Sequence, residues 1–321
     1  ETGFADQKSA ELQLSGDFGS WDFVGGVYYF EEDGGNDQNP NFFDGGPGSH
    51  LNYQEAESKA IYVNAGFQAT DDVRLSAGAR YTEDEKSAFT DLIFGLIQES
   101  NSRDWDEVSW EVAATWDINE RMNVYGAIQN GYQSGQYPPR PFCLFANLDF
   151  TQPGNVSRPN CFEANDNVTA INYEVGLKGR PTDTLSMSVA LFYTDYSDLP
   201  YQISDNTGGG FNTVVIIVDQ TSAGLEWEST WAPTDQFTLY SALGYIDVDV
   251  DDPNPNVGAP LTPEVTASIS PEFTQSLQNG GEIVWRLDWS YRDEMYGQPF
   301  SNVPITDIDD RSLINFDIAY H

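Results

Sequence analysis

The protein has 321 residues, and its 14 Lys and Arg against 51 Asp and Glu give a formal net charge of −37. Nucleic acid is excluded as a partner, because phosphate binding needs a basic surface. An aromatic content of 14% is too high for a disordered acidic chain, and no run of about 20 apolar residues could form a transmembrane helix. An all-β protein remains, including a membrane barrel, whose alternating strands keep the mean hydropathy low.

Alternation of apolar and polar residues predicts about 13 strands. In chain order they are Lys8–Ser15, Trp21–Glu31, Ser58–Ala69, Asp72–Lys86, Arg103–Ile118, Arg121–Gln133, Ile171–Gly179, Thr184–Ser197, Thr213–Trp231, Gln236–Val250, Leu261–Gln275, Glu282–Arg292 and Arg311–Tyr320.

The connections between these strands alternate between tight turns and longer loops. Glu32–Gln54 and Ser134–Thr169 are long, whereas Gly16–Ser20 and Pro181–Asp183 are short. Up-and-down membrane barrels show this asymmetry between their two rims. Strands of roughly 11 to 16 residues also exceed the usual length in soluble sheets. The sequence therefore predicts an antiparallel up-and-down transmembrane β-barrel.

The segment Glu282–Arg292 shows the alternation most clearly. Its odd positions are apolar or aromatic and its even positions are mostly charged or polar, so one sheet face is apolar and the other polar. Across the chain the polar face is expected to form a wall facing the lumen. The charged residues predicted on that wall are Arg74, Arg80, Glu174, Lys178, Glu226, Glu228, Arg286 and Asp288.

Aromatic residues and glycines also follow the barrel pattern. An interfacial girdle near the short turns is predicted from Trp21, Trp116, Tyr125, Trp231 and Phe237. Glycines are expected on the polar face, where barrel strands coil. They are Gly66, Gly78, Gly126, Gly176 and Gly244.

Five phrases resemble recurring barrel motifs of TonB-dependent outer-membrane receptors, and they occur in the family's order. They are Ala79–Lys86 (ARYTEDEK), Gly131–Gly135 (GYQSG), Tyr173–Gly179 (YEVGLKG), Ala190–Tyr196 (ALFYTDY) and Gly224–Glu228 (GLEWE). The resemblance runs from about Ser9 to the end of the chain.

This resemblance implies an outer-membrane receptor that takes up a scarce nutrient (an iron-siderophore, cobalamin or an oligosaccharide), driven by the TonB complex. Family barrels have about 22 strands around a plug. The sequence shows neither a plug nor a TonB box, so residues 1–321 are expected to be a partial barrel domain. Its expected surroundings are outer-membrane lipid and a small-molecule ligand, with TonB acting through a plug outside this chain.

The long segment Ser134–Thr169 and the strand end before it hold the best candidates for ligand contact. Aromatic residues and one arginine there suit stacking on sugars or chelators, or pairing with an anion. The candidates are Tyr132, Gln133, Tyr137, Arg140, Phe142 and Phe145. Cys143 and Cys161 in the same segment are predicted to form a disulfide, with two free thiols as the alternative. A packed cover without a ligand role is equally compatible with the segment.

Catalysis and metal binding have little support. His50 and His321 lie in no nucleophile or zinc context, and Glu226 and Glu228 are interpreted as wall charges. The aspartates Asp247, Asp249, Asp251 and Asp252 lack the pattern of a calcium loop. The sequence therefore predicts neither an enzyme nor a metal or cofactor site. Two alternatives to the receptor remain, a passive porin-like or adhesive barrel and a soluble extracellular glycan-binding β-domain.

Overall fold

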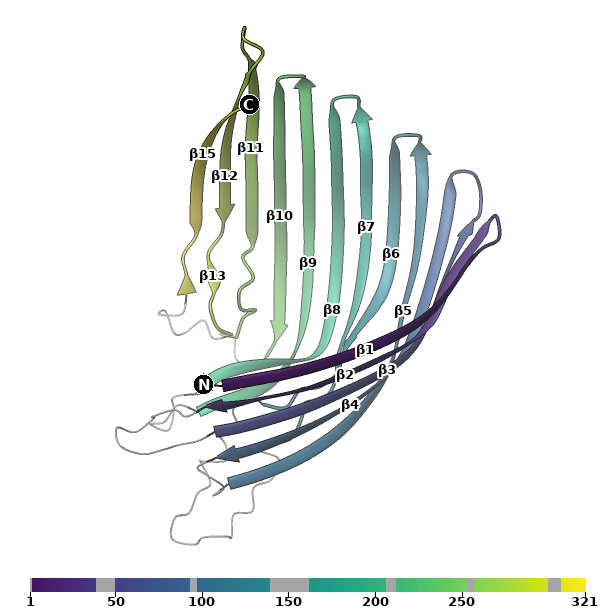
Figure 1. Ribbon diagram of the computed structural model, residues 1–321, viewed down its shortest axis with the longest axis vertical. Coiled ribbons are helices and arrows are strands. Elements are labelled where there is room, and N and C mark those ends of the chain that lie inside the picture. Colours follow the sequence, from purple (N-terminus) through teal and green to yellow (C-terminus); the bar gives the residue numbers. More distant parts are fainter. Residues whose placement is uncertain are drawn as a thin grey trace.

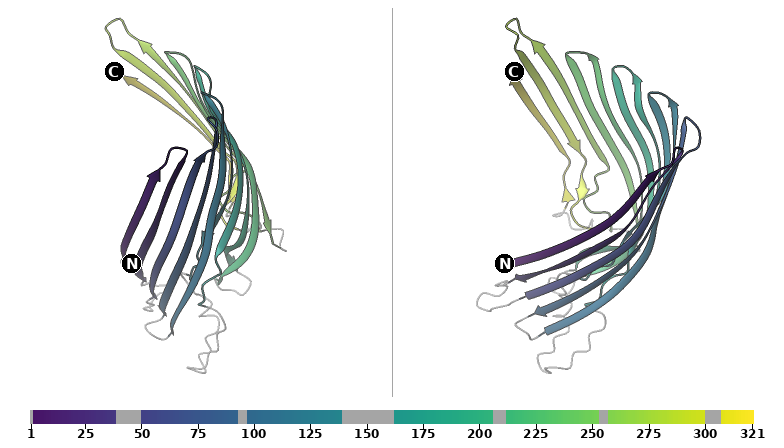
Figure 2. Two further views of the ribbon diagram at one scale, coloured as in Figure 1. Left: turned by 90° about the vertical axis from the view of Figure 1, so that its right-hand side faces the viewer. Right: turned by 45° about the vertical axis from the view of Figure 1, so that its right-hand side comes forward.

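The structure, a computed structural model, describes residues 2–38, 50–92, 97–138, 162–205, 212–252, 257–299 and 307–321. Thirteen strands form one antiparallel sheet in the order β1 to β12 followed by β15. Figure 1 shows this sheet bending into an open trough, and β1 and β15 are its two edges. The further views in Figure 2 show the same single curved layer.

The strands of the sheet are long, up to the 23 residues of β5 and β9. They are β1 Thr2–Asp17, β2 Trp21–Gln38, β3 His50–Gln68, β4 Val73–Leu92, β5 Ile97–Asn119, β6 Met122–Gln133, β7 Val168–Thr182, β8 Leu185–Asp205, β9 Asn212–Thr234, β10 Phe237–Asp251, β11 Val265–Ser276, β12 Glu282–Arg292 and β15 Arg311–Tyr320. No helix that is long and apolar enough to cross a membrane occurs among the described residues.

The number and order of the predicted strands in the sheet are confirmed, but several strands were predicted too short. β2 and β3 take up much of the predicted loop Glu32–Gln54, and β4 and β5 leave only residues 93–96 between them. The reason is that polar and apolar residues are mixed on both faces in these extensions, so hydropathy no longer alternates although the ladder of backbone pairs continues. The short strands β13 (Met295–Tyr296) and β14 (Asp307–Ile308), which pair with each other, were not predicted.

Cross-strand register assigns every strand to the same two faces. One row joins Arg74, Thr115, Tyr125, Gly176, Ala190, Glu226, Gly244, Thr266 and Arg292. We call the side of this row the polar face and the opposite side the apolar face. Side chains on the apolar face stay exposed: Leu12 is 73% exposed and Ile61 58%. A soluble sandwich would bury such a face between two sheets, whereas no second sheet covers it in the described parts of this chain.

The apolar face has the dimensions of a membrane-crossing band. On β4 it runs from Val73 to Tyr81, about 26 Å at the usual rise per residue, close to the roughly 25 Å band of outer-membrane barrels. Trp21 and Trp116 lie near its short-turn limit and Tyr81 and Tyr193 near the opposite one. Aromatic girdles occupy both interfaces of such barrels.

Register corrects two of the predicted positions. Tyr125 pairs with Thr115 and Gly176 and so lies on the polar face, not in the girdle. Gly126 pairs with Ala114 and Val175, which places it on the apolar face rather than the polar one. Both errors come from one strand, since neighbours in a regular strand point to opposite faces and one misplacement implies the other.

One bulge changes the alternation within β8. Tyr196 pairs with Gln220 but the next pair is Leu199 with Val218, so β8 has one residue more than β9 here. Asp198, at the bulge, has a φ of 62°. Its backbone N–H donates to Asp219 Oδ1 at 3.1 Å. Beyond the bulge the odd residues of β8 lie on the polar face, where Tyr201 is buried and donates its hydroxyl to Gln220.

Candidate functional site

The most enclosed region of the described chain is where the segments after β6 and before β7 fold back onto β4 and β5. Buried hydrophobic residues gather there, with Tyr132 packed against them. They are Ala88, Trp105, Tyr137, Phe162 and Ala164, and we call this cluster the β6–β7 seat. Tyr137 and Phe162 stack at a tilt with ring centroids 5.5 Å apart. Both ends of the β6–β7 connection are therefore held on the polar face.

Two basic side chains of the barrel wall bind the backbone of these segments. Lys86 Nζ donates to the carbonyls of Gly135 at 3.0 Å and Ser134 at 3.4 Å. Arg103 Nη1 donates to the carbonyl of Ala164 at 2.8 Å, and its Nη2 forms an ion pair with Asp166. Both cations also lie over the Trp105 ring, at 5.8 Å and 5.3 Å from its centroid. Charged donors make stronger hydrogen bonds than neutral ones, so these contacts fix the segments firmly.

The two segments also bind each other. The backbone N–H of Gln136 donates to Asn165 Oδ1 at 2.9 Å, and the backbone N–H of Asn165 returns a bond to the Gln136 carbonyl at 3.3 Å. Gly135 is required at this crossing, since a Cβ there would collide with the Asn165 carbonyl. The segment that leaves β6 and the segment that enters β7 are thus hydrogen-bonded to each other.

Further polar contacts extend the seat toward the strand ends. The Tyr132 hydroxyl donates to Asp84 Oδ2 at 3.0 Å, and Asn167 donates to Glu107 Oε2 at 3.1 Å. Among the described residues, Trp105 Nε1 and the Tyr137 hydroxyl are buried without a hydrogen-bond partner. Such groups are costly unless a water or a ligand satisfies them. Within the described part of the chain, these two donors of the seat are therefore unused.

Burial changes the protonation behaviour of the seat, which lies beyond the membrane band. It raises the pKa of the Tyr137 hydroxyl, and the nearby Arg103 charge opposes this effect. Burial also lowers the pKa of the Lys86 ammonium, against a smaller opposite effect of Asp84.

The structure brings only part of the predicted ligand set together. Tyr132 and Tyr137 meet in the seat, and Gln133 ends β6. Arg140, Phe142, Phe145 and the predicted Cys143–Cys161 disulfide lie outside the described residues. Sequence reasoning missed Lys86, Arg103 and Trp105, because they are far from the segments they hold and no local pattern links them.

All eight predicted wall charges share the polar face. Arg74 pairs with Asp22 at 2.6 Å and Arg286 with Asp288 at 2.9 Å. Lys178 lies 4.7 Å from the Tyr125 ring centroid, and Arg80 stacks over Tyr28 at 5.3 Å. Much of the basic charge of this face is thus paired or stacked.

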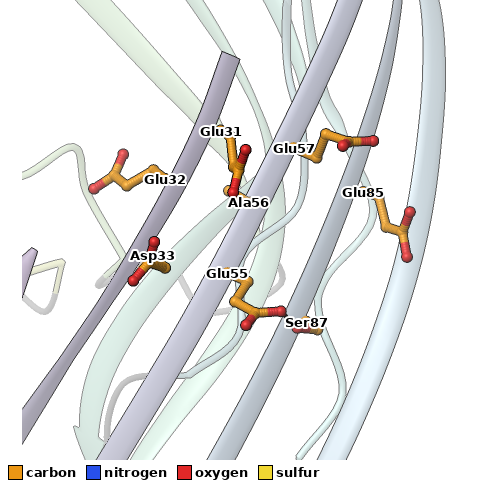
Figure 3. A pocket seen from close by; sticks show the side chains of 8 residues that line it. All are labelled: Glu31, Glu32, Asp33, Glu55, Ala56, Glu57, Glu85 and Ser87. Atoms are coloured by element: carbon orange, nitrogen blue, oxygen red, sulfur yellow. Dashed lines mark hydrogen bonds between the residues drawn. The ribbon is translucent and has the colours of Figure 1, made fainter. Parts of the chain in front are cut away.

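An acidic patch lies beyond the membrane band on β2, β3 and β4. It surrounds a depression of about 260 Å³ lined by Glu31, Glu32, Asp33, Glu55, Ala56, Glu57, Glu85 and Ser87. Figure 3 shows the carboxylates of Glu32 and Glu57 pointing in opposite directions. Among the residues that the structure describes, no three or more His, Cys, Asp or Glu side chains are arranged to hold a metal ion, at this patch or at Asp247–Asp252.

Comparison with known proteins agrees with this architecture. The family model for the TonB dependent receptor-like β-barrel matches residues 2–321. A curated relative, the pesticin receptor of Yersinia enterocolitica, is 26% identical over 188 residues, which is 57% of this chain and 25% of the relative.

Solved structures share the fold over nearly the whole chain. The ferric yersiniabactin uptake receptor FyuA of Yersinia pestis matches with a TM-score of 0.80 and 18% identity, over 98% of this chain and 46% of the receptor. The ferric-catecholate import receptor Fiu of E. coli K12 matches with a TM-score of 0.71 and 17% identity, over 99% of this chain and 48% of the receptor. The chain thus spans a quarter to about half the length of these relatives.

The family's barrels are outer-membrane transporters and not enzymes, which agrees with the exposed apolar band and the single curved sheet. The chain belongs to the TonB-dependent receptor family and forms part of its transmembrane β-barrel.

Proposed function

We propose that the protein contributes the barrel wall to a receptor that imports a scarce small molecule across the outer membrane, with energy delivered by TonB. The family match over residues 2–321 carries this proposal. A ligand that is too large and too dilute to diffuse passively must be bound tightly before it is moved. The plug through which TonB would act belongs to a part of the receptor outside this chain.

The polar face is the proposed lumen wall. In large barrels the interior is polar and faces water or a plug. The ion pairs Arg74–Asp22 and Arg286–Asp288 show that charge on this face is neutralised side by side, which suits a surface that another polar domain slides past. Glu226 and Glu228 are proposed as wall charges of the same kind.

The β6–β7 seat is the proposed ligand-contact region. It holds Tyr132 and Tyr137 over the polar face beyond the membrane band. The Tyr137 hydroxyl and Trp105 Nε1 are donors without a partner among the residues that the structure describes. Gln133, Arg140, Phe142 and Phe145 complete the proposed contact set. Aromatic faces and a few donors are typical of sites for chelators and sugars.

For the ligand itself we propose a metal chelate of the siderophore type. Support comes from the similar solved structures, which are described as receptors for ferric yersiniabactin and for ferric catecholates. Cobalamin and oligosaccharides remain the alternatives to be distinguished by experiment.

Uptake in whole cells tests the proposal. A strain lacking the protein should lose growth on one ferric siderophore as sole iron source, and the intact gene should restore it. Removing TonB should abolish the uptake as well. Uptake that continues without TonB would instead indicate a passive porin-like barrel.

A further inference from the structure

Several glycines on the polar face are covered by neighbouring side chains. A Cβ at Gly176 would meet the Tyr125 ring, and one at Gly224 would meet the Phe192 ring. Gly126, on the apolar face, differs: its Cβ would meet only the Glu174 carbonyl, at 3.8 Å. No side chain of the described residues comes within 4 Å of that Cβ position.

Gly126 lies in an apolar groove of about 680 Å³ on β5 to β8. Two cross-strand rows form it, Ala114–Gly126–Val175–Leu191 and Val112–Ile128–Tyr173–Tyr193. Val175 and Leu191 are each 50% exposed. Tyr173 and Tyr193 close the end nearer the long connections, with ring centroids 6.4 Å apart.

We propose that this groove is a seat for one acyl chain of a membrane lipid. The groove is continuous with the membrane-facing band of the barrel, so hydrocarbon is the medium that reaches it. The side chains that line an open groove lack van der Waals contacts on their open side. A flexible acyl chain in the groove can supply those contacts. The tyrosine pair would lie at the headgroup level, where amphipathic rings are stable. The inference does not depend on the proposed import function.

Photocrosslinking tests the seat in the intact receptor. The protein is reconstituted into phosphatidylethanolamine–phosphatidylglycerol vesicles that contain a phosphatidylcholine with a diazirine in its acyl chain, irradiated, and mapped by mass spectrometry. Adducts should concentrate on Val112, Ile128 and Leu191 relative to Ile61 and Val63 of the same band. Gly126→Leu should lower this enrichment about threefold by filling the groove.

The matched control is Ala65→Leu, which adds bulk to the apolar face of β3 outside the groove and should leave the enrichment unchanged. If Gly126→Leu fails to insert, Gly126→Ala serves instead, since its Cβ fits and should lower the enrichment by a smaller factor. Equal labelling along the whole band, or labelling unchanged by filling Gly126, would overturn the proposal. So would a crosslink from the groove to a second receptor molecule in place of lipid.

Discussion

The two faces of this one sheet are stabilised in different ways. On the polar face, Tyr62 reaches across Gly26 to donate to Glu11, Tyr125 lies over Gly176, and a buried cluster forms around Trp105. On the apolar face, side chains such as Ile61 and Val175 stand exposed. The polar face makes many of its contacts within the protein, whereas the apolar face depends on the surrounding lipid for its contacts.

Two tryptophans on β5 give the largest test of this difference. Trp105 is 6% exposed on the polar face and Trp110 38% exposed on the apolar face. Trp105→Ala should cost about 3–5 kcal/mol, the range for a large aromatic removed from a core. Trp110→Ala should cost less than half as much. Urea unfolding in phospholipid vesicles measures both, and hydrogen exchange at residues 134–138 and 162–167 should rise only in the first variant. Equal costs would mean that the seat is not packed as described.

Adjacent residues on β8 test which face meets the membrane. Val189 lies on the apolar face and Ser188, paired with Lys178 and Glu228, on the polar one. Val189→Arg should cost about 2–4 kcal/mol, the penalty for arginine near the middle of a barrel's lipid face. Ser188→Arg should change the unfolding free energy little. The reverse order of the two effects, measured by unfolding in vesicles, would exchange the assignments of the two faces.

The glycines sharpen the comparison further. Gly176→Ala should cost about 1–3 kcal/mol, because the new methyl group displaces the Tyr125 ring. Gly126→Ala should be neutral or slightly stabilising, because its Cβ meets nothing closer than 3.8 Å. Thermal unfolding of the two variants in one detergent provides the measurement. If Gly126→Ala lowered the thermal stability as much as Gly176→Ala, the groove could not be open as described.

The smallest expected effect concerns two tyrosine hydroxyls. Tyr81 donates to Glu83 at 2.9 Å at the edge of the apolar band, whereas Tyr62 on the polar face interacts with both Glu11 and Gln13. Removing a hydrogen bond costs about 0.5–1.5 kcal/mol. The loss of unfolding free energy, measured by unfolding in vesicles, should lie at the low end of that range for Tyr81→Phe. For Tyr62→Phe it should lie at the high end. Indistinguishable values would show that the second partner of Tyr62 adds nothing.

Alternation along the chain was sufficient to predict the strand number, their order and the shared face of the eight wall charges. It failed where hydropathy loses contrast, as in the extension of β4 from Ser87 to Leu92. Gly126 was misplaced although Val124 and Ile128, on the same side of β6, already indicated its face. The seat could not be predicted, because Tyr137 and Phe162 are far from Trp105 in the sequence. No local periodicity indicates a tertiary contact of this kind.

The bulge at Asp198 has a consequence for how the family's barrels can diversify. A one-residue insertion normally exchanges inside and outside for the rest of a strand, but a bulge absorbs the extra residue locally and keeps the pairing on both sides of it. Since the insertion in β8 lies past Tyr193, the segment that crosses the bilayer keeps its parity. The part of the strand beyond the membrane band can therefore gain or lose residues and place new side chains on the polar face. The part that crosses the membrane is not disturbed.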